Sequence, residues 1–355
     1  MSDEMDLGVL AESFAEMLGA EWPREKAIAF VRGEDAFAGE LWGAMAGLGW
    51  MALTVPEAHG GLGLGLDAAL RLHMALGAAV APAPMLGTTL AGELLAHAGS
   101  AEQQAAWLPG LADGSLRAAF ASADSPAIVA DGSSVSGTCA NLLDALSANL
   151  LFLRASRGGR AGWLAVPADA AGLTTEPHVL VDRSRTLGSV TLSNAAVDDA
   201  MFVAATPAAD AAVTRAAMLA IAADSQGGAE AALVATVEYM KVREQFGVLI
   251  GSFQALKHRV ADHQTALVAS RELLEYAAAL PASDPDALLY ALSAKQHATR
   301  AGAEIARDSV QLHGGVGFTS EYVPHLYLKR GKVNEALWGT RAAVLDRIAD
   351  MLEAA

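Results

Sequence analysis

Residues 243–262 read REQFGVLIGSFQALKHRVAD and separate two long helical patterns. After the break, apolar residues return at steps of three, four and seven, which places them on one face of a helix. They are Phe253, Leu256, Val260, Leu267 and Leu274. The spacing predicts a helix over 252–280, preceded by a helix over 209–242. Between these two helices the chain presents an arginine, a glutamine, a phenylalanine and a glycine together.

Two further helical patterns follow, over 285–312 and 332–353. In the last pattern the apolar positions again recur at helical steps. They are Val333, Leu337, Val344, Ile348 and Leu352. Four long helices with short connections favour an antiparallel four-helix bundle, which we expect to occupy residues 206–355.

The remaining sequence has two different patterns. Residues 1–117 contain amphipathic helical segments interrupted by Pro56 and a run of glycines. Residues 118–205 instead contain short apolar runs bounded by Gly, Ser, Asp and Pro, which is typical of a mostly antiparallel β domain. The predicted fold class is therefore α+β, with an N-terminal helical domain, a central antiparallel β domain and a C-terminal four-helix bundle.

The charge balance excludes some partners. The chain of 355 residues has 24 Lys and Arg against 40 Asp and Glu, a formal charge of −16. Such a surface repels nucleic acid and anionic membranes, although it leaves room for a local basic pocket that binds a phosphorylated ligand. Hydrophobic residues make up 53% of the chain, enough for a large core.

Cysteine and histidine usage indicates where the protein works and what it lacks. Cys139 is the single cysteine, so no internal disulfide or multi-thiolate metal site can form, and a cytoplasmic location is expected. The acidic start MSDEMDLGVL lacks the basic region of a signal peptide. The uncharged stretch 73–92 contains Pro82 and Pro84, so we interpret it as buried structure rather than a membrane span. None of the nine histidines has metal-site spacing, and we expect no metal.

Two motifs admit both a structural and a ligand-binding interpretation. Arg243 is suited to the carbonyl end of the preceding helix, but an arginine fork next to Gln245 and Phe246 also suits a pyrophosphate and a flat ring. The glycines of QLHGGVGF, at 311–318, are typical of a helix end, or of a backbone that a ligand approaches closely. The third glycine-rich stretch, HGGLGLGL at 59–66, lacks the dinucleotide fingerprint and is interpreted as a turn.

In their order along the chain, three segments resemble the acyl-CoA dehydrogenase family. They are GLGWMALTVPEAHGGLGLGL (47–66), REQFGVLIGSFQALKHRVAD (243–262) and QLHGGVGFTSEYVPHLYLKR (311–330). The resemblance covers nearly the whole chain, including the order of helical and β regions. The sequence HLYLKR most resembles the corresponding segment of a subgroup with shorter chains, some of whose members form one half of a two-subunit enzyme.

The resemblance implies FAD as cofactor and α,β-dehydrogenation of an acyl-CoA thioester, with an electron-transfer flavoprotein reoxidising the flavin. It also implies a tetramer and, by the subgroup, bulky acyl groups such as steroid side chains. By resemblance, several residues contact the pyrophosphate and adenine half of an FAD shared with a neighbouring protomer. They are Arg243, Gln245, Phe246, Ile250, Phe253, Gln311, Gly314 and Gly315, with Thr340 also assigned to the cofactor. Arg215 matches an arginine near the acyl-CoA site.

The catalytic base of the family has no counterpart here. In the segment LWGT, at 337–340, Trp338 stands where the family has its glutamate. Some relatives carry the base one residue before the position of Arg215, and here that residue is Thr214. Neither side chain accepts a proton at neutral pH. The β domain departs too, because ASADSP (121–126) and GTCANLL (137–143) replace family strands that contact the flavin, and the flavin-stacking tryptophan is absent. Ser122 and Ser125 remain as donors for a flavin edge.

Four hypotheses follow from the resemblance and its departures. The preferred one is a subunit without a base, in a heteromeric enzyme whose homologous catalytic subunit holds most of the FAD. The second is a self-sufficient homotetramer with a substitute base, for which Glu335 and Glu321 are the candidates. The third is a flavin-less scaffold of the same fold, and the fourth a flavin-dependent monooxygenase. Two missing bases beside an intact pyrophosphate motif favour the first.

Overall fold

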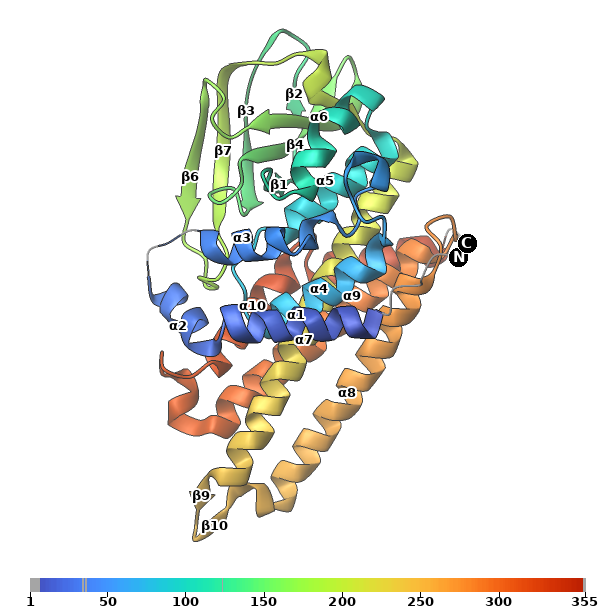
Figure 1. Ribbon diagram of the computed structural model, residues 1–355. Coiled ribbons are helices and arrows are strands. Elements are labelled where there is room, and N and C mark those ends of the chain that lie inside the picture. The colour runs from blue at the N-terminus through green and yellow to red at the C-terminus, as the bar shows by residue number, and fades with distance from the viewer. Residues whose placement is uncertain (1–6, 34, 36, 123, 354–355) are drawn as a thin grey trace. The chain divides into compact units, whose positions relative to one another are not determined.

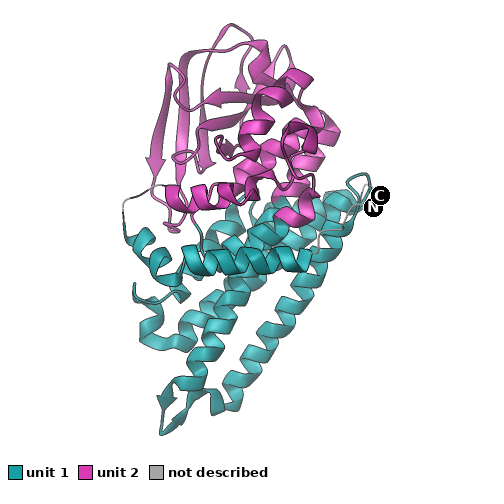
Figure 2. Ribbon diagram, in the orientation of Figure 1, with its two compact units in different colours: residues 1–33, 70–81, 218–355 teal, residues 34–69, 82–217 magenta. Residues whose placement is uncertain are grey.

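The computed structural model describes residues 7–33, 35, 37–122 and 124–353, so the first residues of the acidic start and Ala123 of the segment 121–126 lie outside it. The chain divides into two compact units (Figure 2). Unit 1 comprises Met1–Gly33, Leu70–Ala81 and Met218–Ala355. Unit 2 comprises Glu34–Ala69 and Pro82–Ala217. Helix α4 (Gly65–Ala78) and helix α7 (Pro207–Val242) each contribute residues to both units.

Unit 1 contains the predicted helical bundle. Its helices besides parts of α4 and α7 are α1 (Leu7–Glu21), α2 (Arg24–Arg32), α8 (Gln254–Ala279), α9 (Ala287–His313), α10 (Pro324–Ala336) and α11 (Arg341–Glu353). The predicted stripe on α8 is confirmed at Leu267 and Leu274, which are buried. Leu267 packs with Leu233 of α7 and Ile305 of α9, so the apolar faces of three helices meet in one cluster.

Helix α4 approaches α7 very closely in unit 1. A Cβ atom on Gly77 would lie 2.0 Å from the Asp224 carbonyl oxygen, and one on Gly227 would lie 1.9 Å from the Met74 carbonyl oxygen. Glycine is therefore required on both helices at this crossing, because any side chain would clash with backbone.

A buried polar network fixes α10 against α7. The Arg330 guanidinium donates to both carboxylate oxygens of Asp224, at 3.0 Å from Nε and 2.6 Å from Nη2. Asn334 Nδ2 donates to Asp224 Oδ1 at 2.8 Å and to Ser225 Oγ at 2.9 Å. Arg330 Nη1 also donates to the Ala81 carbonyl oxygen at 3.1 Å. The buried charges are thus paired and hydrogen-bonded, as burial requires.

The prediction of one continuous helix over 332–353 is wrong. Helix α10 ends at Ala336 and α11 begins at Arg341, because the backbone between them turns left-handed. Trp338 has φ 54° and Gly339 has φ 105°, values that a right-handed helix cannot contain. Thr340 then caps α11, since its hydroxyl oxygen accepts from the Ala343 N–H at 3.4 Å.

Between α7 and α8 the chain forms a tight hairpin, seen where the two long helices end in Figure 1. Strands β9 (Glu244–Gln245) and β10 (Val248–Leu249) pair antiparallel, and a 3₁₀ turn, η4 (Ile250–Ser252), leads into α8. Phe246 and Gly247, the two residues of the turn, have φ of 57° and 78°. Two left-handed residues are typical of a type I′ hairpin, whose twist suits the paired strands.

Unit 2 contains helices and two sheets. The helical elements are α3 (Gly39–Gly47), η1 (Trp50–Ala52), η2 (Glu57–His59), α5 (Met85–Ala98), α6 (Ala101–Ala112) and η3 (Asp199–Met201). The strands are β1 (Ala118–Phe120), β2 (Ile128–Val129), β3 (Ser134–Leu143), β4 (Leu150–Arg157), β5 (Arg160–Pro167), β6 (Leu173–His178), β7 (Leu187–Ala196) and β8 (Phe202–Ala204).

One sheet has the order β1-β4-β5-β8, with β2 also paired to β4, and the other has the order β3-β7-β6 (Figure 1). Among the described strands, the pairs that β1 and β2 make with β4 are parallel, and the other pairs are antiparallel. The predicted mostly antiparallel β domain is therefore confirmed. Val135, Leu151 and Val190 belong to one apolar cluster with residues from both sheets, so the sheets share a core.

The three-domain division at residues 117 and 205 stays a prediction. The two compact units are a different division of the chain, and they group the N-terminal helices differently. Helices α1 and α2 belong to the bundle unit, whereas α3, α5 and α6 belong to the β unit. Among the described helices, none is both long and apolar enough to cross a membrane. The described residues likewise contain no group of three or more His, Cys, Asp or Glu side chains placed to hold a metal ion.

Candidate functional site

A pocket of about 750 Å³ lies in unit 1, at the end of the bundle that carries the β9–β10 hairpin. Its walls come from the last turn of α7, the hairpin, the first turn of α8 and the turn after α9. Every residue that the resemblance assigned to FAD lines it, except Thr340. These residues are Arg243, Gln245, Phe246, Ile250, Phe253, Gln311, Gly314 and Gly315.

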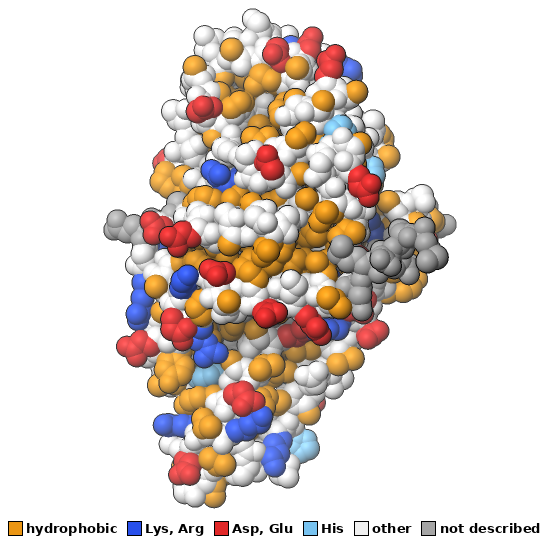
Figure 3. Space-filling view, in the orientation of Figure 1, with side chains coloured by type: hydrophobic (Ala, Val, Ile, Leu, Met, Phe, Trp, Pro, Cys, Tyr) orange, Lys and Arg blue, Asp and Glu red, His pale blue; other side chains and the backbone are white. Residues whose placement is uncertain are grey.

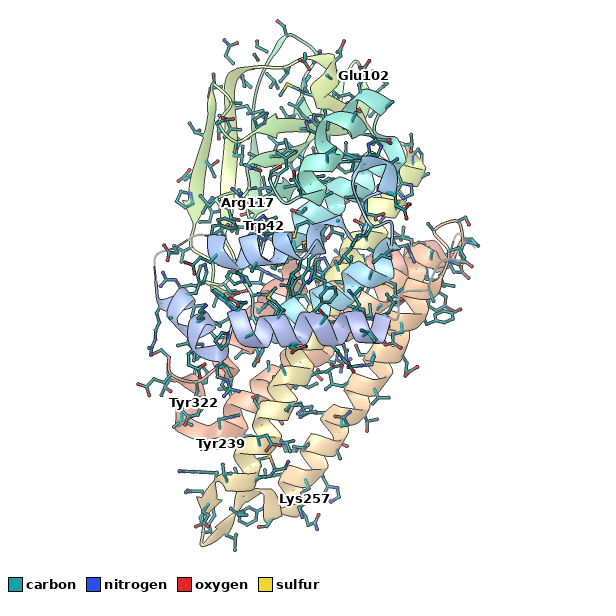
Figure 4. The ribbon with its side chains drawn as sticks, in the orientation of Figure 1. Trp42, Glu102, Arg117, Tyr239, Lys257 and Tyr322 are labelled. Atoms are coloured by element: carbon teal, nitrogen blue, oxygen red, sulfur yellow. The ribbon has the colours of Figure 1, made fainter. Side chains whose placement is uncertain are left out.

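The floor of the pocket is apolar and well packed. Ile250 packs with Met240 and Leu312 in a buried cluster that Phe253 also contacts. Below the rim, the His313 ring stacks on Tyr239 with centroids 4.4 Å apart and planes at 22°. Figure 4 labels Tyr239 on α7 near this end of the bundle.

His313 is held in one orientation and one protonation state. Its Nδ1 lies 2.7 Å from the Ser309 carbonyl oxygen, which can only accept, so Nδ1 carries the proton. Burial lowers the pKa of His313 below its ordinary value, the nearby Arg24 charge lowers it further, and the bond to Ser309 opposes them. The imidazole is therefore neutral at pH 7 and serves as a packing surface, not as a charge.

The rim carries Arg243 on a fixed backbone. The Arg243 N–H donates to the Tyr239 carbonyl oxygen at 2.9 Å, and the Arg243 carbonyl oxygen accepts from the Ile250 N–H at 2.8 Å. In the part of the chain that the structure describes, the Arg243 guanidinium forms no ion pair. Its charge and its five N–H groups are therefore available to a ligand.

A second arginine on the wall is neutralised. The Arg259 guanidinium pairs with the Asp308 carboxylate, whose other oxygen lies 2.8 Å from His263 Nε2. The pocket thus combines one uncompensated cation with one compensated one. Figure 3 shows Lys and Arg side chains among hydrophobic and some acidic side chains over this end of the bundle, on a protein that is acidic as a whole.

Aromatic surface completes the rim. Phe246, at the tip of the hairpin, is 94% exposed, and its ring meets the edge of Phe253 at 6.3 Å and 81°. Gln245 Nε2 donates to the neighbouring Glu244 carbonyl oxygen at 2.7 Å, which keeps the amide at the pocket mouth. The exposed ring therefore offers a ligand a flat apolar surface at the pocket mouth.

The glycines after α9 differ in what they do for the chain itself. Gly314 has φ 65° and ends the helix, and Gly317 packs so that an added Cβ would lie 2.6 Å from the Val310 carbonyl oxygen. Gly315 meets neither condition, since a Cβ there would have no atom within 4 Å. The chain's own packing does not require glycine at 315, whereas a ligand lying against the backbone would.

The other predicted residues lie elsewhere. Thr340 is the cap of α11 and lies outside the pocket, so its assignment to the cofactor stays a prediction. Arg215 is buried on the part of α7 that belongs to unit 2. Burial lowers the pKa of Arg215, and the Glu93 carboxylate opposes this shift. Its proposed contact with substrate is likewise untested.

Neither position of the base holds a proton acceptor. Trp338 is partly buried between α10 and α11, and Thr214 is buried on α7 in unit 2. Of the two substitutes considered, Glu335 accepts from Lys332 Nζ at 2.6 Å, and Glu321 is exposed after the glycine turn. In unit 2, the Ser122 hydroxyl oxygen accepts from the Asp124 N–H at 3.3 Å, a hydrogen bond within its own loop.

Reasoning from sequence missed Tyr239, Leu256, Arg259 and His313 as pocket residues. Helical spacing contains a signal for Tyr239, because it precedes Arg243 by one turn of α7 and shares its face. His313 lies inside the quoted motif 311–330, but no spacing rule pairs it with a tyrosine on another helix.

Comparisons with known proteins agree on one family. The model of the acyl-CoA dehydrogenase N-terminal domain matches residues 9–115, and that of the C-terminal domain matches residues 211–353. The chain is 32% identical to acyl-CoA dehydrogenase IpdE2 of Mycobacterium tuberculosis over 323 residues, which cover 91% of this chain and 88% of that protein.

Two solved structures are similar over almost the whole chain. The ChsE4-ChsE5 complex from Mycobacterium tuberculosis contains a chain with a TM-score of 0.91 and 27% identity, covering 100% of this chain and 98% of that one. The Tcur3481-Tcur3483 steroid ACAD G363A variant gives a TM-score of 0.88 and 32% identity, with 98% of both chains covered.

Proposed function

Because the chain belongs to the acyl-CoA dehydrogenase family of oxidoreductases, we propose that it is the subunit without a catalytic base in a heteromeric, FAD-dependent acyl-CoA dehydrogenase. In this assembly its pocket binds the pyrophosphate and adenine half of an FAD whose flavin end lies with a homologous catalytic subunit. The ChsE4-ChsE5 complex among its structural neighbours supports this arrangement.

The observation that carries the proposal is the convergence of two distant segments on one pocket. Residues 243–253 and 311–315 line it together, with one unpaired guanidinium at the rim and an open glycine on the wall. A pyrophosphate needs paired donors and an adenine needs a flat apolar contact, and this pocket offers both.

Each residue has a defined task in this proposal. The Arg243 fork donates to the pyrophosphate oxygens, and Gln245 adds a neutral donor beside it. Phe246, Ile250 and Phe253 exclude water from the adenine half. The backbone at 314–315 approaches the nucleotide closely, since no Cβ keeps it away. The FAD that these residues would hold would supply the hydride acceptor for dehydrogenation of the acyl-CoA.

Removal of the α proton is assigned to the partner. Loss of a general base costs about 10²–10⁴-fold in rate, so a chain with Trp338 and Thr214 at both base positions is too slow alone. Glu335 is no substitute, because its carboxylate is paired with Lys332. A catalytic subunit with glutamate at the position of Trp338 would supply the base.

The acyl group, the electron acceptor and the location follow the family. We propose a bulky acyl-CoA such as a steroid side-chain thioester, in keeping with the steroid enzyme among the structural neighbours. An electron-transfer flavoprotein would reoxidise the flavin. The single cysteine suits a reducing cytoplasm.

Coexpression with a homologous chain that keeps the glutamate tests the proposal. We expect this chain alone to be colourless, and the two together to form a yellow tetramer that an acyl-CoA bleaches. Bleaching by this chain alone would instead establish a self-sufficient enzyme. A colourless, inactive assembly would refute the cofactor role and leave a scaffold.

Two variants test the pocket within the assembled enzyme. Arg243→Ala removes the pyrophosphate fork and should lower FAD content, whereas Lys241→Ala removes another exposed charge that lies outside this pocket and should not. A Cβ atom at position 315 would meet no atom within 4 Å, so Gly315→Ala leaves the chain's own packing unchanged and should also release FAD. Equal FAD content in all three would contradict the assignment.

A further inference from the structure

Lys295, in the first third of α9, is a buried cation that the proposed function does not use. It is 1% exposed and ranks among the largest fully buried side chains of the protein. Removing an ammonium from water is costly, and burial lowers the pKa of Lys295 from 10.5 to about 8. An apolar side chain of similar length would fill this space without that cost, so the polar head itself must have a role.

The Lys295 ammonium contacts the end of α10 and the connection that follows it. Its Nζ donates to the Gly339 carbonyl oxygen at 2.6 Å and to the Glu335 carbonyl oxygen at 3.3 Å. The first acceptor lies just before the cap of α11, and the second lies in the last turn of α10. One ammonium therefore joins the end of α10, where the Glu335 carbonyl is among those that a helix end leaves unpaired, to the Gly339 carbonyl in the connection 337–340.

That connection has a backbone that needs support. Trp338 has φ 54°, a left-handed conformation that is uncommon for a bulky side chain, and Gly339 follows at φ 105°. Backbones of this kind persist only where their surroundings hold them. Thr340 fixes the C-terminal side through its cap, and Lys295 reaches the connection from a different helix.

We propose that Lys295 is a positioning residue, whose ammonium holds the connection 337–340 and thereby sets the placement of Trp338. The connection is the segment that resembles the base-bearing segment of the family, so the lysine controls the shape of the site where that base is missing. The inference does not depend on FAD binding, because it concerns contacts within unit 1 alone.

The charge environment makes the contact sensitive to pH. The Glu335 carboxylate on α10 raises the pKa of Lys295 and so opposes the effect of burial. That carboxylate is itself paired with Lys332, which faces solvent. As the pH rises through about 8, Lys295 loses its charge in the folded protein, and its attraction to the two carbonyls weakens.

Fluorine NMR of the full chain labelled with 5-fluorotryptophan tests this. The chain has 6 tryptophans, and Trp338→Phe identifies the resonance of Trp338. In the wild type we expect that resonance alone to shift with a midpoint near pH 8. Lys295→Met should move the Trp338 resonance and abolish its pH dependence, while Lys295→Arg should restore the wild-type position in part. Lys332→Met, which removes a neighbouring exposed charge, should change neither.

Three results would overturn the proposal. One is a Trp338 resonance that does not titrate near pH 8 in the wild type, a measurement that needs no variant to fold. Another is an unchanged resonance in Lys295→Met. The third is an equal shift of all tryptophans in that variant, which would make Lys295 a general stabilising residue.

Discussion

Substitution Asp224→Asn tests whether the buried network is what fixes α10 in unit 1. Asp224 is 3% exposed and Arg330 is 4% exposed, so the change leaves an arginine buried without its counter-charge. Arg330 loses the charge of an acceptor that it contacts at 3.0 and 2.6 Å. Removing one partner of such a pair costs about 3–5 kcal/mol, whereas total stabilities are about 5–15 kcal/mol.

The matched control is Glu238→Gln, which breaks a pair on the protein surface. Lys241 and Glu238 have side-chain exposures of 61% and 62%, and their pair spans one turn of α7. Exposed pairs contribute about 0–1 kcal/mol, because water and salt screen them.

Urea denaturation followed by circular dichroism compares the two variants with the wild type under the same conditions. We expect a large fall in the unfolding midpoint for Asp224→Asn and almost none for Glu238→Gln. The combined change Asp224→Leu with Arg330→Met should recover most of the loss, since no charge is then left buried. Equal midpoints for the two single variants would refute the reasoning.

Three further outcomes follow from single residues. Gly77→Ala should destabilise the protein by about 1–3 kcal/mol, because the added Cβ would lie 2.0 Å from the Asp224 carbonyl oxygen. Gly19→Ala should instead stabilise α1 by about 0.5–1 kcal/mol, because its Cβ would meet no atom within 4 Å. Thermal melting of both variants measures the two effects. Burial raises the pKa of Cys139 to about 11, so a thiol reagent at pH 8 should react fully only after denaturant is added, and fast labelling of the native chain would contradict this. Between pH 8 and 10.5 the unfolded chain holds the Lys295 proton and the folded chain does not. The free energy of unfolding of the wild type, relative to that of Lys295→Met, should therefore rise with pH by up to about 3 kcal/mol. A flat or falling difference would refute the lowered pKa of Lys295.

Much of the site could be predicted from sequence because its residues fall in two continuous motifs. The segment at 243–253 breaks a helical pattern, and the segment at 311–315 ends another, so each stands out locally. Their meeting in one pocket could be expected only from the family resemblance. The stacking of Tyr239 on His313 beneath the rim could not be predicted, because a ring contact between two helices leaves no local pattern in the sequence.

The sequence by itself determined the helices, the mostly antiparallel β region, the acidic surface and the lack of a proton acceptor at both base positions. These properties depend on residue identity and on repeats of two or 3.6 residues, which neighbours in the chain specify. Only the tertiary structure decided that the final helix breaks at Trp338, and that Lys295 reaches across from α9 to hold the break. The physical reason is that a left-handed tryptophan has no favourable local signal, and its support comes from a residue more than forty positions away.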